Sequence, residues 1–289
     1  MFQVEKFSNL PKHQSLIDRA VGVVTADPRV VGLYIGGSQS ADEYSDIDLS
    51  IYFANQADLN SFRNDRLEIA KRIGKIKAES MSTIPFIYVV FYEEEVKLDF
   101  DYYVVPAELR PDKVYCTILY DPQGHLEQMK EESKNMKWDT DIADLAHRIK
   151  HYQVAISYTV AKICRGEFWD ALDAIDFYRK YLVKFEDSFA LRKQENYRRL
   201  EKKLDDERLT VLNKTLVPEL TQVNLFKGMD AIFEYFDRFL KHKFQQLEIF
   251  PEEYYRTMRE YYERMKKKTL ELEEGEKIPK TENEHKSYR

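Results

Sequence analysis

The chain has 289 residues, of which 43% are hydrophobic and 33% charged, and its formal net charge is −6. This length predicts one large or two ordinary domains, and the composition indicates a globular protein with a sizeable core. The acidic balance argues against a broad nucleic-acid-binding surface, because such a surface needs a basic face.

Predicted elements in the first part of the chain indicate an α+β domain. Residues 12–26 have the apolar spacing of a helix, which ends at Asp27-Pro28 because the residue before a proline disfavours the α conformation. The elements that follow are strands over 30–35 and 47–53, a helix over 58–74, and a hairpin with strands over 84–91 and 96–105.

After Pro122 the sequence shows helical spacing and no further convincing strand. The predicted helices cover residues 139–165, 167–187, 196–214, 219–246 and 251–270. We therefore predict a mixed-sheet domain over 1–121, an all-α bundle over 122–270, and a polar, disordered tail over 271–289.

Cysteines and apolar runs limit the class of protein further. Cys116 and Cys164 are far apart, so they predict neither a metal motif nor a disulfide scaffold. The first residues contain no apolar signal region, and the longest apolar run, residues 84–92, is too short to span a bilayer. We therefore expect a cytoplasmic protein with no membrane partner.

The stretch YIGGSQSADEYSDIDLSIYF carries the strongest chemical signal. Asp46 and Asp48 are two residues apart in a strand and point to one face, where paired carboxylates repel each other unless a cation lies between them. Oxygen ligands of this kind suit Mg²⁺. Gly36 and Gly37 let backbone N–H groups approach an anion, and Ser38 adds a hydroxyl donor. Together these residues predict a metal–triphosphate site.

Such a site needs a third carboxylate, and the later strand VKLDFDYYVV offers two. Asp99 and Asp101 alternate with apolar residues, so both lie on one face and either could complete the site. The alternative is that both are ordinary acids of an edge strand.

Over residues 30–105 the chain resembles the DNA-polymerase-β-like nucleotidyltransferase superfamily. The shared pattern is a strand, two glycines and a serine, a short loop, Asp-x-Asp, and an acid on a later strand. In that superfamily the paired aspartates bind Mg²⁺, which implies this role for Asp46 and Asp48. The glycine–serine turn contacts the nucleotide triphosphate there, which implies the same for Gly37 and Ser38.

The helical second half makes the chain similar to bacterial antibiotic adenylyltransferases, in particular the aminoglycoside 6-adenylyltransferases. In that family the third acid begins a strand of the form D-h-x-h-h-P. Here DYYVVP matches it, so Asp101 is the first choice and Asp99 the second. This chain has GGS and DID where that family tends to have EGS and DYD.

This resemblance implies a magnesium-dependent enzyme. It would move AMP from ATP to a hydroxyl of a small, cationic, aminoglycoside-like acceptor and release pyrophosphate, with a role in antibiotic resistance. Two alternatives stay open: transfer to a protein or RNA acceptor, and a non-catalytic, antitoxin-like binding protein. The acidic net charge disfavours RNA, and the intact carboxylates disfavour a protein without catalysis.

An acidic ridge lies along the predicted helix over residues 167–187. An acid recurs there every three residues, at Glu167, Asp170, Asp173 and Asp176, with Trp169 among them. The ridge is either a solvated helix face or an acceptor pocket, in which acids bind ammonium groups and an aromatic ring packs on a sugar. For the pocket we single out Trp169, Asp173 and Asp176.

Other helical residues carry weaker signals. His147 and His151 are four residues apart but lack the glutamate of an H-E-x-x-H motif, so we expect no metal between them. Cys164, on an apolar helix, is expected in the core.

Overall fold

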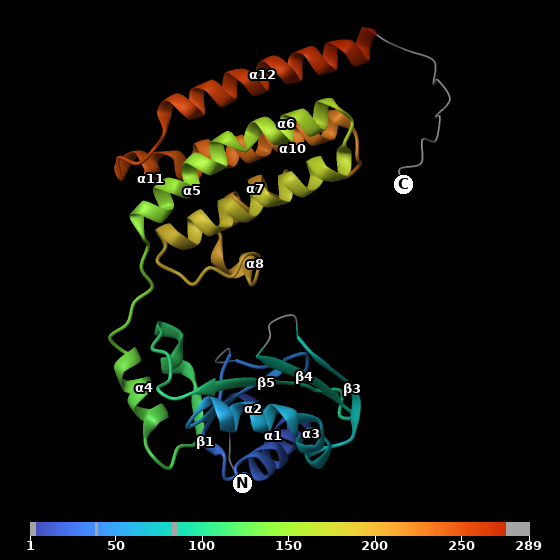
Figure 1. The fold of residues 1–289 in the computed structure, drawn as a ribbon. Helices are drawn as coiled ribbons and strands as arrows, with labels where there is room; N and C mark the ends of the chain where they lie inside the picture. Colours follow the sequence, from blue (N-terminus) through green and yellow to red (C-terminus); the bar gives the residue numbers. More distant parts are fainter. Residues whose placement is uncertain (1–3, 38–39, 83–85, 276–289) are drawn as a thin grey trace. The chain divides into compact units, whose positions relative to one another are not determined.

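The computed structural model describes residues 4–37, 40–82 and 86–275, with side chains up to residue 271. The chain divides into two compact units, Met1–Lys137 and Trp138–Arg289 (Figure 1). The first unit contains a mixed β-sheet, and the described part of the second is helical, which confirms the predicted α+β class. No helix in the described ranges is both long and apolar enough to cross a membrane.

Six strands of the first unit form one sheet in the order β3-β4-β5-β2-β1-β6. Their bounds are β1 (Val30–Ile35), β2 (Ile47–Phe53), β3 (Ile76–Met81), β4 (Ile87–Tyr92), β5 (Lys97–Val104) and β6 (Thr117–Tyr120). Strands β2 and β5 pair in parallel, and the other neighbours are antiparallel. The predicted strands β1 and β2 and the β4–β5 hairpin are therefore confirmed.

Strands β3 and β6 are absent from the sequence-based prediction. Both are edge strands, which pair on one side only. Strand β3 (KIKAESM with its preceding lysine) is largely exposed and lacks the apolar alternation that marks a strand with one buried face. Strand β6 has four residues, too few for a periodic pattern.

Helices α1 (Pro11–Val24), α2 (Gln56–Asn64) and α3 (Arg66–Ile73) share one hydrophobic core with the sheet. The single helix expected over 58–74 is thus two helices. The break comes at Asp65, whose N–H is shared between the carbonyls of Ser61 and Phe62 and whose carboxylate binds Arg29.

Strand alternation separates the two faces of the sheet. Ile47, Leu49 and Ile51 of β2 are fully buried in the core that includes α1, α2 and α3. The intervening residues of β2, including Asp48, point to the opposite face. At one end this opposite face is covered by α4 (His125–Ser133), which belongs to the first unit and packs on β1. The unit boundary at residue 137 therefore differs from the predicted boundary at residue 121 by this helix.

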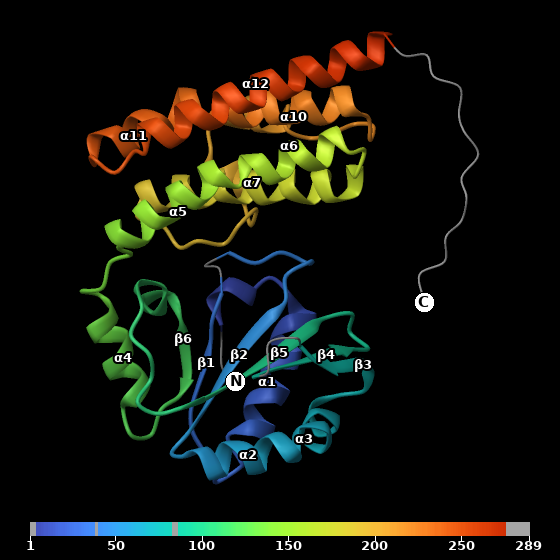
Figure 2. The ribbon, with the colours of Figure 1, turned by 45° about the horizontal axis from the view of Figure 1, so that its top comes forward.

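The second unit is a bundle in which α6, α7, α10 and α12 run side by side (Figure 2). Its helices are α5 (Ile142–Val154), α6 (Ile156–Cys164), α7 (Phe168–Phe189), α8 (Leu200–Lys203), α9 (Asp206–Asn213), α10 (Gln222–Tyr235), α11 (Lys241–Gln246) and α12 (Glu252–Gly275). A π-helical segment, Phe236–Leu240, joins α10 to α11.

Long helices predicted for this unit are interrupted in three places. The helix expected over 139–165 is broken at Ala155, the one over 196–214 contains α8 and α9, and the one over 219–246 contains α10, the π-helical segment and α11. The predicted start of the tail, residue 271, is too early, because residues 271–275 continue α12. The rest of that tail, residues 276–289, lies outside the described residues.

Candidate active site

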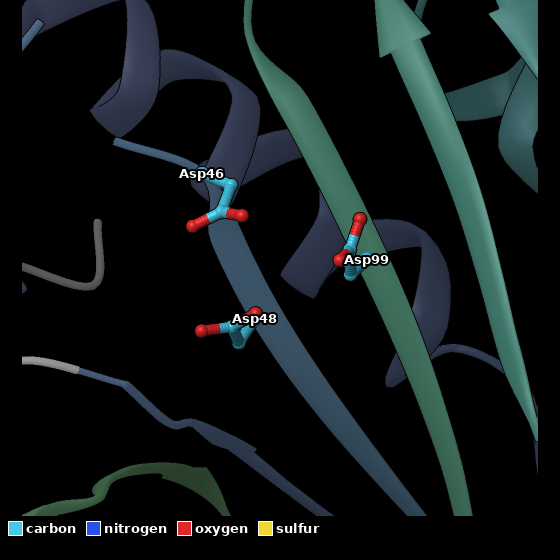
Figure 3. A group of neighbouring side chains, drawn as sticks. All are labelled: Asp46, Asp48 and Asp99. Carbon is cyan, nitrogen blue, oxygen red and sulfur yellow. The ribbon is translucent and has the colours of Figure 1, made fainter. Parts of the chain in front are cut away.

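Acidic and polar side chains line the face of β2 and β5 that points away from α1, α2 and α3, and we call this row the carboxylate ladder. The parallel register places Asp48 opposite Asp99 and Ser50 opposite Asp101. Asp46 precedes β2, and its carboxylate contacts Lys97 at the start of β5. Because residues two apart share a face, Asp46, Asp48, Asp99 and Asp101 all project from the same side of the sheet. Figure 3 shows three of them on the two adjacent strands.

Three of these carboxylates could hold a metal ion. One oxygen from each of Asp46, Asp48 and Asp99 lies within 4.8 Å of the other two. The structure therefore groups Asp99, the second choice from the sequence, with the Asp-x-Asp pair, whereas Asp101 lies two residues further along β5.

The chemistry of this group fits a hard divalent cation. All donors are carboxylate oxygens, which Mg²⁺ prefers. Oδ1 of Asp99 is buried and has no hydrogen-bond partner among the described residues. A buried oxygen without a partner is costly, so this atom favours a bound cation. Burial, with Asp46 and Asp99 nearby, also raises the pKa of Asp48, and Lys6 and Lys97 oppose this shift.

A glycine turn lies beside the carboxylates. The N–H of Gly36 donates to the carbonyl of Asp48 at 3.0 Å, which ties the turn to β2. Gly37 has a φ of +85°, and a Cβ on it would lie 2.8 Å from Oδ2 of Asp48. Position 37 thus requires glycine for its backbone conformation and for the space beside the carboxylate. Ser38, the third residue of the predicted phosphate-binding turn, lies outside the described residues.

We expect Gly37→Ala to lower the activity of the candidate site by roughly 10- to 100-fold, because the new methyl group must displace the Asp48 carboxylate. Gly124→Ala is a matched control, since Gly124 also has a positive φ, +75°, but a Cβ there would meet nothing within 4 Å. Both variants should lose some stability in thermal unfolding, because both positions have a positive φ, and only Gly37→Ala should lose activity. Equal activity in the two variants would contradict the placement of the turn in the site.

Two lysines that the motif analysis did not include lie at the site. Lys97 Nζ is 2.7 Å from Oδ2 of Asp46 and 3.0 Å from Oδ2 of Asp99. Lys6, half-buried, donates to the carbonyl of Gly36. Burial lowers the pKa of Lys6, with Asp48 and Asp46 opposing the shift. The 3₁₀ helix that carries Lys6, Glu5–Phe7, gave no sequence signal because a single turn has no periodicity.

Asp101 lies in a different environment from the group of Asp46, Asp48 and Asp99. Its Oδ1 is buried and has no hydrogen-bond partner among the described residues. Burial, with the negative charges of Asp48 and Asp99, raises the pKa of Asp101 to about 7, and Lys113 and Arg110 oppose this rise. A carboxyl group with a pKa near neutrality can accept and release a proton at physiological pH, which suits a general base.

Lys113 is a buried cation that contacts two aromatic residues near Asp101. Its ammonium group is buried, donates to the Tyr34 hydroxyl, and lies 4.9 Å from the Tyr34 ring centroid and 5.5 Å from that of Tyr103. Tyr34 is opposite Ser50, which is opposite Asp101. Along this face of the sheet the side chains thus change from acidic, at Asp46, to aromatic and cationic, at Tyr34 and Lys113.

His13 holds the loop before Asp46. Its buried ring stacks on Phe7, with centroids 5.4 Å apart, and Nε2 lies 2.8 Å from the carbonyl oxygen of Ser45. This contact fixes the backbone directly before Asp46, the first aspartate of the Asp-x-Asp pair.

The acidic ridge of the second unit lies on α7 and is largely neutralised by ion pairs. Lys162 bridges Glu167 and Asp170. Asp176 binds Arg179 and Lys180, each at 2.7 Å, and accepts from the Tyr197 hydroxyl at 2.8 Å.

Two of the singled-out residues remain available on α7. Asp173 is exposed and forms no ion pair with the described residues. The Trp169 side chain, one helical turn earlier, is 77% exposed. His147 and His151 are also exposed, and His151 packs edge-on against Phe177 with ring centroids 5.8 Å apart. Cys164 is half-buried against the bundle core.

Comparison with known proteins adds likenesses at low identity. No protein-family model and no curated protein matches this chain. An aminoglycoside 6-adenyltransferase from Bacillus subtilis is similar in structure, with 15% identity and a TM-score of 0.44 over 87% of this chain and 96% of that one. A nucleotidyltransferase-like protein from Exiguobacterium sibiricum is also similar, with 9% identity and a TM-score of 0.37 over 81% and 74% of the two chains. Both TM-scores are below 0.5, so neither likeness supports a particular activity.

Proposed function

We propose that this protein is a nucleotidyltransferase that moves AMP from ATP to a hydroxyl group of a small cationic acceptor. The observation that carries the proposal is the carboxylate ladder of Asp46, Asp48, Asp99 and Asp101 beside a turn in which Gly37 has a positive φ. Paired acids next to a close-approach glycine turn are what a metal-bound triphosphate needs.

Each part of the ladder has a separate role. Asp46, Asp48 and Asp99 would hold Mg²⁺, which when bound supplies positive charge to the triphosphate. The backbone at Gly37 lets the phosphates approach the sheet. Lys6, beside the same turn, adds a positive charge on the nucleotide side.

The transfer step uses Asp101 as the base. Asp101 accepts the proton of the acceptor hydroxyl as that oxygen forms a bond to the α-phosphorus of ATP. The bond from the α-phosphorus to the oxygen bridging to the β-phosphorus breaks, and pyrophosphate leaves with that bonding pair. Most of the rate increase comes from holding the two reactants in line and from charge stabilisation.

The helical unit carries side chains that suit a cationic acceptor. An amino sugar carries ammonium groups and hydroxyls, so it fits an exposed acid with an aromatic ring one turn away, as at Asp173 and Trp169. Asp176 is a weaker candidate than the sequence suggests, because Arg179, Lys180 and Tyr197 already occupy its carboxylate.

We expect Asp173→Asn to raise the KM for a cationic acceptor several-fold and to leave the KM for ATP unchanged, because it removes one unpaired charge from α7. Asp170→Asn is the control on the same helix, since Asp170 is already paired with Lys162 at 2.9 Å. Steady-state kinetics with both substrates would measure this. A rise in the KM for ATP instead would show that Asp173 does not contact the acceptor.

The assay that tests the proposal is pyrophosphate release from MgATP in the presence of amino sugars, RNA or candidate protein acceptors. Release with an amino sugar and formation of an AMP adduct of matching mass would support the proposal. Release with RNA or protein alone would assign the macromolecular alternative. An absence of nucleotide binding and of release with every acceptor would favour the antitoxin-like binding protein.

A further inference from the structure

Lys97 is in direct contact with the proposed metal ligands. Its ammonium nitrogen lies 2.7 Å from Oδ2 of Asp46 and 3.0 Å from Oδ2 of Asp99, so one cation bridges two of the three carboxylates. Each of these distances is that of a charge-assisted hydrogen bond. Lys97 therefore occupies one oxygen on each of two carboxylates that a divalent ion would need.

The strand geometry makes this contact a built-in feature of the site. Lys97 and Asp99 are two residues apart on β5, so both side chains leave the same face. Ile47 is opposite Leu98, which brings Asp46, the residue before β2, next to Lys97. The register of β2 and β5 thus positions the lysine beside the carboxylates, and no flexible loop is needed.

Electrostatics gives this lysine a consequence. Without a cation, the negative charges of Asp46, Asp48 and Asp99 repel one another across less than 5 Å. A single positive charge between two of them offsets part of that repulsion. A divalent ion offers two charges at a shorter distance, and it competes with Lys97 for the same two carboxylates.

We propose that Lys97 is an internal counter-cation, which stabilises the metal-free site and is displaced from Asp46 and Asp99 when a divalent cation binds. Lys97 thereby weakens metal affinity and keeps the carboxylates in place between turnovers. This inference rests on the proposed function, because it takes Asp46, Asp48 and Asp99 as the metal ligands. Lys6 differs, since its hydrogen bond goes to the carbonyl of Gly36 and it acts on Asp48 and Asp46 through its charge.

The test uses the full chain without nucleotide and Mn²⁺ as the probe, with binding measured by electron paramagnetic resonance and calorimetry. Lys97→Gln removes the competing charge, so we expect its Kd for Mn²⁺ to be roughly 5- to 10-fold lower than that of wild type. Lys97→Arg keeps a cation and should restore a Kd near the wild-type value. Lys162→Gln is the matched control, because Lys162 also bridges two carboxylates, Glu167 and Asp170.

Thermal unfolding provides a second, independent measurement. Lys97→Gln should have a lower Tm than wild type in EDTA, and the difference should disappear in saturating Mn²⁺. A merely structural lysine would lower the Tm equally under both conditions. That outcome, or a Kd for Mn²⁺ that is unchanged or weaker in Lys97→Gln, would overturn the inference.

Asp48→Asn separates failure of this inference from failure of the proposed function. If Asp48→Asn abolishes Mn²⁺ binding while Lys97→Gln leaves the Kd unchanged, the metal site stands and the role of Lys97 is wrong. If Mn²⁺ binds equally well to Asp48→Asn and wild type, or binds to none of the variants, the carboxylates are not the metal site and both proposals fail.

Discussion

Asp48→Asn should fold normally and transfer nucleotide at least ~10³-fold more slowly than wild type, the scale of losing an indispensable active-site group. Asparagine keeps the shape of the side chain but removes the negative charge at the centre of the ladder. Asp48 is opposite Asp99 on β5, and its carboxylate contributes an oxygen to the group within 4.8 Å. We therefore expect Mn²⁺ binding and pyrophosphate release to be lost together.

The stability of Asp48→Asn should not fall with its activity, and at alkaline pH it should equal or exceed that of wild type. The pKa of Asp48 is raised in the folded protein, first by burial and then by Asp46 and Asp99. A carboxyl group with a raised pKa costs stability as the pH increases through its folded value, because the folded state then has to lose a proton that it binds more tightly than the unfolded state. Asp48→Asn should therefore have an equal or higher Tm than wild type in EDTA at pH 8. For the activity of the same variant, turnover close to that of wild type would contradict the assignment of the metal site.

Asp101→Asn should lower kcat by at least ~10²-fold, the scale of a lost general base, while Mn²⁺ binding stays close to that of wild type. The reason for the separation is the register: Asp101 pairs with Ser50, one step beyond the Asp48–Asp99 pair. Asp99→Asn is the matched comparison, and it should weaken Mn²⁺ binding. The opposite pattern, with metal binding lost in Asp101→Asn and kept in Asp99→Asn, would exchange the two roles.

The pH dependence gives Asp101 a signature of its own. Its pKa is raised to about 7, so the carboxylate base predominates above that pH, and a bound cation would lower this pKa. Wild-type kcat/KM should rise with pH along an acid limb at or below pH 7, and Asp101→Asn should lack that limb. In EDTA, wild type should lose stability relative to Asp101→Asn as the pH increases from 4 to 8, because the raised pKa penalises the charged form in the folded state. An unchanged limb in the variant would assign the base to another group.

Local sequence is enough to determine the class of fold and the chemical character of the site. Strand alternation puts Asp46 and Asp48 on one face, glycine at position 37 predicts the close approach beside them, and helical periodicity predicts the second half of the chain. These features depend on neighbouring residues, whose spacing can be read directly. Edge strands β3 and β6 and the breaks within long helices carry no such periodic signal.

Tertiary structure decides which residues meet. Asp99 and Asp101 share a face, so alternation cannot say which one lies opposite Asp48; the parallel register of β2 and β5 does. Lys97 contacts the Asp46 carboxylate, and Lys6, about ninety residues away in sequence, contacts the adjacent turn at the carbonyl of Gly36. Tyr197 contacts Asp176 from outside its helix. Such contacts come from long-range packing, and no local pattern in the sequence records them.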